Sequence, residues 1–221
     1  MDVFADQPGA GLFREEEKMA EAMSPGRRRE FATVRHCARA AGRRLGMPAA
    51  PLLKDSDGAP MWPNGVLGSM THCPGYRAAA VARHRDVCAL GIDAEVNSPM
   101  KQEALEFSAL LEELDQLTRM RRADDSVSWD RLLCSAKEAV YKAWFPLTRI
   151  RLGFDETSIS FSPDGSGFCA HIPKAEYTSF PTVVRGRWMA QHGLLLTAVV
   201  VLTAAGRTTH QATEASATSM G

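Results

Sequence analysis

The sequence predicts an α+β fold made of two halves. Residues 27–45 and 129–144 have apolar side chains at helical spacing, and each half of the chain runs from helical segments to segments of strand character. The pattern breaks at Asn97-Ser98-Pro99, between the halves. We therefore expect an N-terminal lobe over residues 1–97, a C-terminal lobe over 98–204, and a disordered tail over 205–221, which is rich in Ala, Thr and Ser.

The first half begins with an expected irregular arm over residues 1–12 and a short helix over 15–23. Ser24-Pro25 is a typical N-cap followed by a first-turn proline, and the next apolar spacing predicts a helix that starts at Arg27 and stops at Gly46. The opposite face of this helix is basic, and for most of its arginines we expect only contact with solvent. These residues are Arg28, Arg35, Arg39 and Arg43.

The rest of the first half predicts a loop and two strands. Residues 48–65 are dense in Pro, Gly and Asp and predict a loop, and residues 68–72 predict a glycine-containing turn. Small apolar residues over 76–83 predict a strand. The segment 87–93 is almost continuously apolar, which is typical of a buried strand.

The second half predicts two helices and then strands. The first helix is expected over 103–122 and has a charged face. The second is expected over 129–144, where the apolar stripe includes Trp129 and Trp144, and Pro146 closes the helix. Strands are expected over 157–162, 167–172, 186–191 and 194–202.

Composition and charge limit the classes of function. The 221 residues are 45% hydrophobic and 24% charged, as in soluble globular proteins. Lys and Arg number 26, as do Asp and Glu, so bulk charge indicates neither a nucleic acid nor a membrane as partner. The five cysteines form no Cys-x-x-Cys pair, which favours a reducing, cytoplasmic compartment. No apolar run of about 18 residues and no signal peptide is found, so we expect no membrane span.

Acidic residues at two places suggest a metal site. Asp93 and Glu95 are two residues apart at the end of the buried strand, so both carboxylates face one side and would repel each other unless a cation such as Mg²⁺ lies between them. Glu138 and Lys142 share one face of the 129–144 helix. Taken singly, each pair has a simpler explanation, namely a solvated loop for the two acids and an ordinary surface ion pair for Glu138 and Lys142.

The segment Ser69-Met70-Thr71-His72 offers hydroxyls, backbone N–H groups and an imidazole to a phosphate. The signal is weak, because neither a G-x-x-x-x-G-K-[ST] loop nor a G-x-G-x-x-G motif is present, and the absence of G-x-S-x-G argues against a serine hydrolase. A lone histidine such as His72 is more often structural than catalytic.

The order of these segments is more specific than any one of them. GSMTH at 68–72, GIDAE at 91–95 and WDRLLCSAKEAVYKAW at 129–144 together resemble the motifs of the 4′-phosphopantetheinyl transferases of the Sfp/EntD type. The resemblance covers roughly residues 24–203. The basic helix and the lysine-bearing loop before the histidine segment resemble the EntD-like branch of that family.

The resemblance implies a monomer of two similar α+β lobes related by a pseudo-twofold axis, with the active site between the lobes. Such enzymes transfer the 4′-phosphopantetheine arm of coenzyme A (CoA) to a serine of an acyl or peptidyl carrier protein and release adenosine 3′,5′-bisphosphate. The carrier protein would be a transient partner, and exposed apolar residues within 100–117 are expected to contact it.

The resemblance also implies a role for each candidate residue. Asp93, Glu95 and Glu138 would hold Mg²⁺, or Mn²⁺, against the pyrophosphate, and Glu138 or a metal-bound water would deprotonate the carrier serine. Asp93, Glu138, Lys142 and His72 would be the catalytic residues. The CoA-binding residues would be Arg27, Arg35, Lys54, Ser69, Thr71, His72, Lys137 and Lys142.

Two alternative functions use the same candidate residues. In the first, the metal site belongs to a hydrolase of CoA or of another nucleotide pyrophosphate. In the second, the protein binds CoA without catalysis, and Glu138 only pairs with Lys142.

Overall fold

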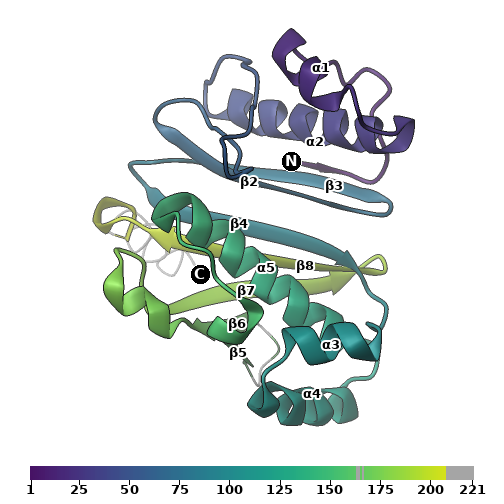
Figure 1. Ribbon diagram of the computed structural model, residues 1–221, viewed down its shortest axis with the longest axis vertical. Helices are drawn as coiled ribbons and strands as arrows, with labels where there is room; N and C mark the ends of the chain where they lie inside the picture. The colour runs from purple at the N-terminus through teal and green to yellow at the C-terminus, as the bar shows by residue number, and fades with distance from the viewer. Residues whose placement is uncertain (163–164, 166, 208–221) are drawn as a thin grey trace, which may run out of the picture.

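The computed structural model describes residues 1–162, 165 and 167–207, and these residues form the expected α+β fold. Within them, helices pack on two antiparallel sheets (Figure 1). A three-stranded sheet has the order β1-β3-β2, and a five-stranded sheet has the order β4-β8-β7-β6-β5.

The N-terminal half places one long helix on the three-stranded sheet. Its elements are β1 (Asp2–Val3), α1 (Arg14–Ala20), α2 (Pro25–Arg44), β2 (Val66–Cys73) and β3 (Tyr76–Arg83). Helix α2 begins as expected, because Ser24 Oγ accepts a hydrogen bond from the Arg27 N–H. Its apolar face packs on β3, where Cys37 and Ala38 are buried (Figure 1).

Two local expectations in this half were wrong. The arm over 1–12 contains β1, which pairs with β3 through Asp2 and Val3. The expected turn over 68–72 is part of β2, and the real turn lies at Pro74-Gly75, where Gly75 has a φ of 78°. Glycine tolerates this left-handed conformation. The segment 68–72 is extended because each of its residues has a partner on β3.

The C-terminal half places α5 on the five-stranded sheet (Figure 1). Its elements are β4 (Val87–Val96), α3 (Gln102–Ser108), α4 (Leu111–Ala123), α5 (Trp129–Thr148), β5 (Ser158–Phe161), β6 (Gly167–His171), β7 (Val183–Gln191) and β8 (Leu194–Leu202), with short 3₁₀ turns at Phe154–Glu156 and Pro173–Tyr177. Buried residues of α5, Trp144 among them, form the main core with the inner face of the sheet.

The prediction of a single helix over 103–122 was also wrong, because the chain is extended at Ala109, between α3 and α4. The Glu113 carboxylate accepts a hydrogen bond from the Leu110 N–H and so caps α4 from within. The carbonyl of Ser108 accepts a bond from Lys137 Nζ of α5, which satisfies the end of α3.

Two boundaries lie further along the chain than expected. Pro146 does not end α5, which continues to Thr148 and stops where Arg149 takes a left-handed conformation with φ 61°. Strand β4 continues past Asp93 to Val96, so Asp93 and Glu95 lie within the strand. Although β4 precedes the proposed lobe boundary at residue 97, it pairs with β8 of the C-terminal half. The boundary and the pseudo-twofold relation remain predictions.

Strand β4 and helix α5 approach each other unusually closely at Gly91. A Cβ atom added there would lie 1.9 Å from the backbone oxygen of Ala139 and 2.7 Å from the backbone nitrogen of Ala143. Only glycine permits this contact. As a result, Asp93, two residues along the strand and on the same face, lies directly against α5.

Beyond β8, residues 204–207 form a helical turn, and the remainder of the predicted tail, 208–221, lies outside the described residues. In the part of the chain that is described, no helix combines the length and the apolar character needed to cross a membrane.

Candidate active site

A cavity of about 300 Å³ lies between α2, the loop around Lys54, β2 and the C-terminal part of α5. The predicted CoA-binding residues, apart from Lys137, line it: Arg27, Arg35, Lys54, Ser69, Thr71, His72 and Lys142. Residues that are far apart in the sequence therefore meet at one site. Phe31, Tyr141 and Phe145 form an apolar part of the wall.

The cavity is strongly cationic. Four cationic side chains line it, whereas Asp57 is the single acidic residue among its described lining residues; the four are Arg27, Arg35, Lys54 and Lys142. Burial lowers the pKa of Arg35 to about 10, against the opposing effect of Glu16, so the guanidinium stays charged at neutral pH. A site of this kind favours a ligand with several negative charges, such as phosphates.

Arg35 is held in place by its surroundings. Its guanidinium carbon lies 3.3 Å from the centre of the Phe31 ring, and its Nε donates a hydrogen bond to the Leu52 carbonyl over 3.2 Å. The fully buried Glu16 lies 3.6 Å away. Because Leu52 lies in the loop that carries Lys54, Arg35 connects α2 to this loop.

Glu16 was not recognised from the sequence. Its carboxylate accepts hydrogen bonds from the Leu52 N–H at 2.8 Å, the Phe13 N–H at 2.9 Å and Arg39 at 3.0 Å. It therefore joins α1, α2 and the Lys54 loop behind the cavity. The only local signal is its position as a capping residue of a short helix, and that pattern does not indicate a contact with Leu52 or Arg39.

Asp93 does not itself line the cavity but contacts Lys142 and Thr71, which do, and it is almost fully buried. Its Oδ1 accepts hydrogen bonds from Lys142 Nζ at 2.7 Å and from Thr71 Oγ1 at 3.1 Å, and its Oδ2 accepts one from Ser135 Oγ at 2.9 Å. The structure thus brings Asp93 and Lys142 together, and the alternative in which Lys142 pairs with Glu138 along the helix gives way to a contact between β4 and α5. Ser135 is a further residue that the sequence did not indicate.

Glu95 and Glu138 are half-buried and near Asp93. Burial raises the pKa of both carboxyls, and the charge of Asp93 raises them further, whereas Arg131 lowers the pKa of Glu95 and Lys142 that of Glu138. Glu95 is 3.6 Å from Arg131. Within the described residues, Glu138 has no hydrogen-bond or ion-pair partner.

Asp93, Glu95 and Glu138 offer the oxygen donors that Mg²⁺ prefers. No three acidic, histidine or cysteine side chains in the described part of the chain converge closely enough to hold a metal ion as they stand. Their chemistry fits a hard cation nonetheless, because the charge of Asp93 raises the pKa of both Glu95 and Glu138, and Glu138 is half-buried with no ion pair within the described residues. A cation beside Glu138 would supply the missing partner.

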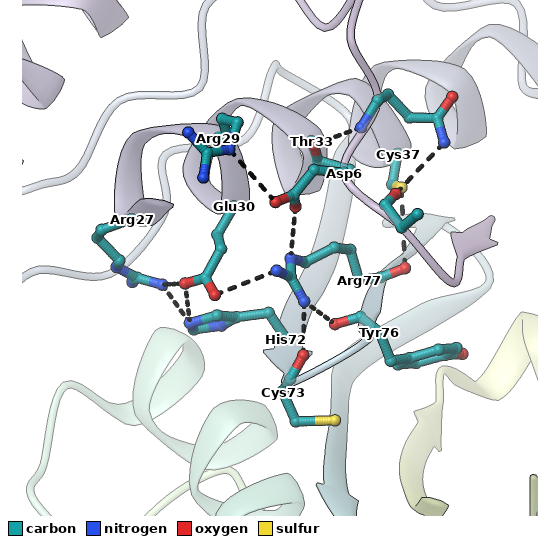
Figure 2. A network of polar contacts seen from close by, with 12 residues as sticks. Asp6, Arg27, Arg29, Glu30, Thr33, Cys37, His72, Cys73, Tyr76 and Arg77 are labelled. Atoms are coloured by element: carbon teal, nitrogen blue, oxygen red, sulfur yellow. Dashed lines mark hydrogen bonds and ion pairs between the residues drawn. The ribbon is translucent and has the colours of Figure 1, made fainter. Parts of the chain in front are cut away.

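His72 lies beside Arg27 at the edge of the cavity (Figure 2). Burial lowers the pKa of His72, as do the charges of Arg27, Arg77 and Lys142, and Glu30 opposes them. The imidazole is therefore neutral at pH 7, and its Nε2 accepts a hydrogen bond from the Arg27 guanidinium. His72 can thus orient a cationic side chain without adding charge of its own.

Ser69 and Thr71 have a second role besides lining the cavity. Ser69 Oγ accepts a hydrogen bond from the Ile92 N–H at 3.0 Å, and Thr71 Oγ1 accepts one from the Ala94 N–H at 3.1 Å. These side-chain oxygens link β2 to the edge of β4, where the two sheets meet without a backbone ladder. The two hydroxyls therefore connect the strand that lines the cavity to the strand that carries Asp93.

Lys137 lies elsewhere. Its side chain is 2% exposed and forms an ion pair with Glu113 over 2.7 Å. Its ammonium also donates hydrogen bonds to the carbonyls of Ser108 and Phe154. All three protons of the ammonium have acceptors, and the side chain does not reach the cavity. The geometry therefore gives no support to the expected contact between Lys137 and CoA.

Comparison with known proteins matches both halves of the chain to family models. Residues 15–82 match the 4′-phosphopantetheinyl transferase N-terminal domain, and residues 89–193 match the 4′-phosphopantetheinyl transferase superfamily. The chain is 47% identical to the 4′-phosphopantetheinyl transferase Svp of Streptomyces mobaraensis, over 91% of this chain and 83% of the relative. It is 42% identical to PptT of Mycobacterium tuberculosis, over 90% of both chains, and 29% identical to the enterobactin synthase component D of Salmonella typhi, over 81% of this chain and 75% of the relative.

Proposed function

Because the chain belongs to the 4′-phosphopantetheinyl transferase superfamily, it is an enzyme that transfers the 4′-phosphopantetheine group from CoA to a carrier protein, and we propose that the cationic cavity beside Asp93 is where CoA binds. The observation that carries the proposal is the convergence of Arg27, Arg35, Lys54 and Lys142 on one cavity next to three acids. Phosphates satisfy the cations, and a metal ion satisfies the acids.

In the proposed reaction, the serine hydroxyl of the carrier protein attacks the phosphorus that bears the pantetheine arm. A new P–O bond forms, the pyrophosphate P–O bond breaks, and adenosine 3′,5′-bisphosphate leaves. Arg27, Arg35 and Lys54 hold the phosphates, with His72 orienting Arg27, and Lys142 neutralises charge at the pyrophosphate. Glu138 is the group proposed to accept the proton of the serine, since burial raises its pKa.

Mg²⁺ is the proposed metal, with Mn²⁺ as a substitute, and Asp93, Glu95 and Glu138 would hold it. When bound, it would neutralise charge on the pyrophosphate. Asp93 is the firmest of the three ligands, because hydroxyls of Thr71 and Ser135 fix both of its oxygens. Lys142 shares Asp93 Oδ1, so its ammonium lies close enough to face the same phosphate.

Further parts of the proposal concern the carrier protein and the compartment. Phe107 of α3 and Leu111 at the start of α4 are 79% and 84% exposed, and we infer that they contact the carrier protein, since large exposed apolar residues are typical of docking sites. All five cysteines carry free thiols, which supports the proposal that the protein works in the cytoplasm; that it works as a monomer is proposed from the family resemblance alone.

One assay separates transfer from the alternatives. The protein is incubated with CoA, Mg²⁺ and an apo carrier protein, and the carrier is weighed by mass spectrometry. Transfer adds one phosphopantetheine unit. CoA cleavage without carrier modification would indicate a hydrolase, and CoA retention without turnover would indicate a binding module.

The metal site has its own test. Asp93→Ala and Glu138→Ala should abolish turnover while circular dichroism shows an intact fold, and chelation of the metal should do the same reversibly. Full activity in either variant, or in the presence of a chelator, would rule out the metal-site assignment.

A further inference from the structure

A network of charged side chains lies behind Arg27 and His72 (Figure 2). Its centre is Glu30, one helical turn from Arg27 on α2. One carboxylate oxygen accepts a hydrogen bond from Arg27 at 3.1 Å and lies 3.7 Å from His72 Nε2. The other accepts one from Arg77 Nη2 at 3.1 Å. Glu30 itself does not line the cavity.

Arg77 provides a rigid anchor for this network. It is 5% exposed, and its Nη1 donates hydrogen bonds to the carbonyls of Cys73 and Tyr76, on the two sides of the β2–β3 turn. Its Nε lies 3.1 Å from Asp6. Arg77 thus holds the hairpin strand on which His72 lies, and Glu30 ties that hairpin to α2.

The charges around Glu30 indicate which residues depend on it. Arg77 keeps a carboxylate, that of Asp6, if Glu30 loses its charge. Arg27 does not, because Glu30 is its single ion-pair partner among the described residues. The like charge of Arg35, about two turns further along α2, also repels Arg27. Without Glu30, Arg27 is therefore free to move away from His72.

We propose that Glu30 is a positioning residue, which holds Arg27 beside His72 in the orientation that meets the phosphates of CoA. Glu30 acts through Arg27 and does not touch the ligand. The inference rests on the proposed function, in which the cavity binds CoA. It adds a residue outside the cavity whose effect on the ligand is indirect.

A double-mutant cycle on CoA binding tests this. CoA affinity is measured by isothermal titration calorimetry for the wild type, Glu30→Gln, Arg27→Met and the double variant. We expect Glu30→Gln to weaken CoA binding about three- to tenfold, because Arg27 and Glu30 are partly exposed and such pairs are modest. Arg27→Met should weaken it at least as much, and the double variant should bind like Arg27→Met alone.

Glu17→Gln is the matched control. Glu17 of α1 pairs with Arg28 on the outer side of α2, so this variant also removes one carboxylate that faces α2, but it should leave CoA affinity unchanged. Steady-state kinetics give a second readout: Glu30→Gln should raise KM for CoA and leave kcat at saturating CoA within about twofold. If Glu30→Gln melts more than a few degrees below Glu17→Gln, the cycle is repeated with Glu30→Asp, which keeps the charge and shortens the reach.

Wild-type affinity in Glu30→Gln would overturn the inference, as would a double variant in which the two losses multiply, since Glu30 would then act independently of Arg27. Failure of the wild type to bind CoA, or wild-type affinity in Arg27→Met, would instead count against the proposed CoA site. The two failures are therefore distinguishable.

Discussion

Replacement of Lys137 by methionine separates a structural role from a CoA contact. The ammonium and the Glu113 carboxylate are 2% and 1% exposed and 2.7 Å apart. Methionine would leave Glu113 buried with only the N–H groups of Leu110 and Ile159 as donors. It would also leave the carbonyls of Ser108 and Phe154 without this donor. Loss of one partner of a buried ion pair costs about 3–5 kcal/mol.

In a chain of this size, about 1 kcal/mol corresponds to about 2–4 °C in Tm. Lys137→Met should therefore lower Tm by about 6–20 °C. In the double variant with Glu113→Gln, which also removes the uncompensated charge, the two losses should not add. Thermal melts followed by circular dichroism give these values, and carrier modification is measured at 15 °C, below the transition of every variant.

Lys142→Met is the matched control on the same helix. It should lower kcat/KM at least about 100-fold but lower Tm less than Lys137→Met does, because Lys142 is partly exposed and Asp93 keeps the hydroxyls of Thr71 and Ser135 as donors. Lys137→Met should show the reverse, with kcat/KM for CoA within about threefold of the wild type. An unchanged Tm together with a raised KM for CoA in Lys137→Met would refute the reasoning and restore Lys137 as a ligand contact.

Three further predictions concern the acids and the helix–sheet contact. Burial raises the pKa of Glu138 in the folded protein above its value in the unfolded chain, so ionisation of Glu138 destabilises the metal-free protein, and stability returns as the pH falls through the raised pKa. Glu138→Gln should therefore raise the Tm of the metal-free protein at neutral pH and weaken the pH dependence of Tm in scanning fluorimetry. The same variant should abolish turnover. Gly91→Ala should lower Tm by at least about 6 °C, since the new Cβ meets the α5 backbone, and an unchanged Tm would contradict the close contact. Glu16→Gln should lower the free energy of unfolding in urea by at least about 3 kcal/mol, because the side chain is fully buried among hydrogen-bond donors. It should also weaken CoA binding, since Glu16 holds Arg35 and the Lys54 loop. A free energy of unfolding near that of the wild type would argue against this role of Glu16.

Most elements of the fold could be predicted from local pattern. The apolar stripe of α5 and the alternation of helix and strand character in both halves were sufficient to indicate the α+β class. The errors fall where distant parts of the chain decide the local conformation, as in the pairing of 68–72 with β3 and the break after Ser108. The break after Ser108 depends on Lys137 and Glu113, and no residue within 103–122 is itself a helix breaker.

The candidate site was predicted through the order of its motifs, because spacing alone left Asp93 and Glu138 as ordinary surface acids. The structure adds the residues that support the site from behind. Glu16 reaches Leu52 from 36 positions away, and Glu30 reaches Arg77 from 47. Glutamates on an amphipathic helix are common, so nothing in the local sequence distinguishes these two from solvated ones.

The hydroxyls of Ser69 and Thr71 make the junction of the two sheets depend on side chains. The hydrogen bonds of a backbone ladder tolerate most substitutions, whereas the two hydrogen bonds at this junction require the side-chain oxygens of Ser69 and Thr71. A chain cut in the turn at 84–86 would leave Ser69 and Thr71 on one fragment and Asp93 on the other. Reassembly of such fragments would then depend on these two side-chain oxygens and on the apolar cluster that contains Tyr76, Ala78 and Ala94, and recovered activity would show that the fragments had paired.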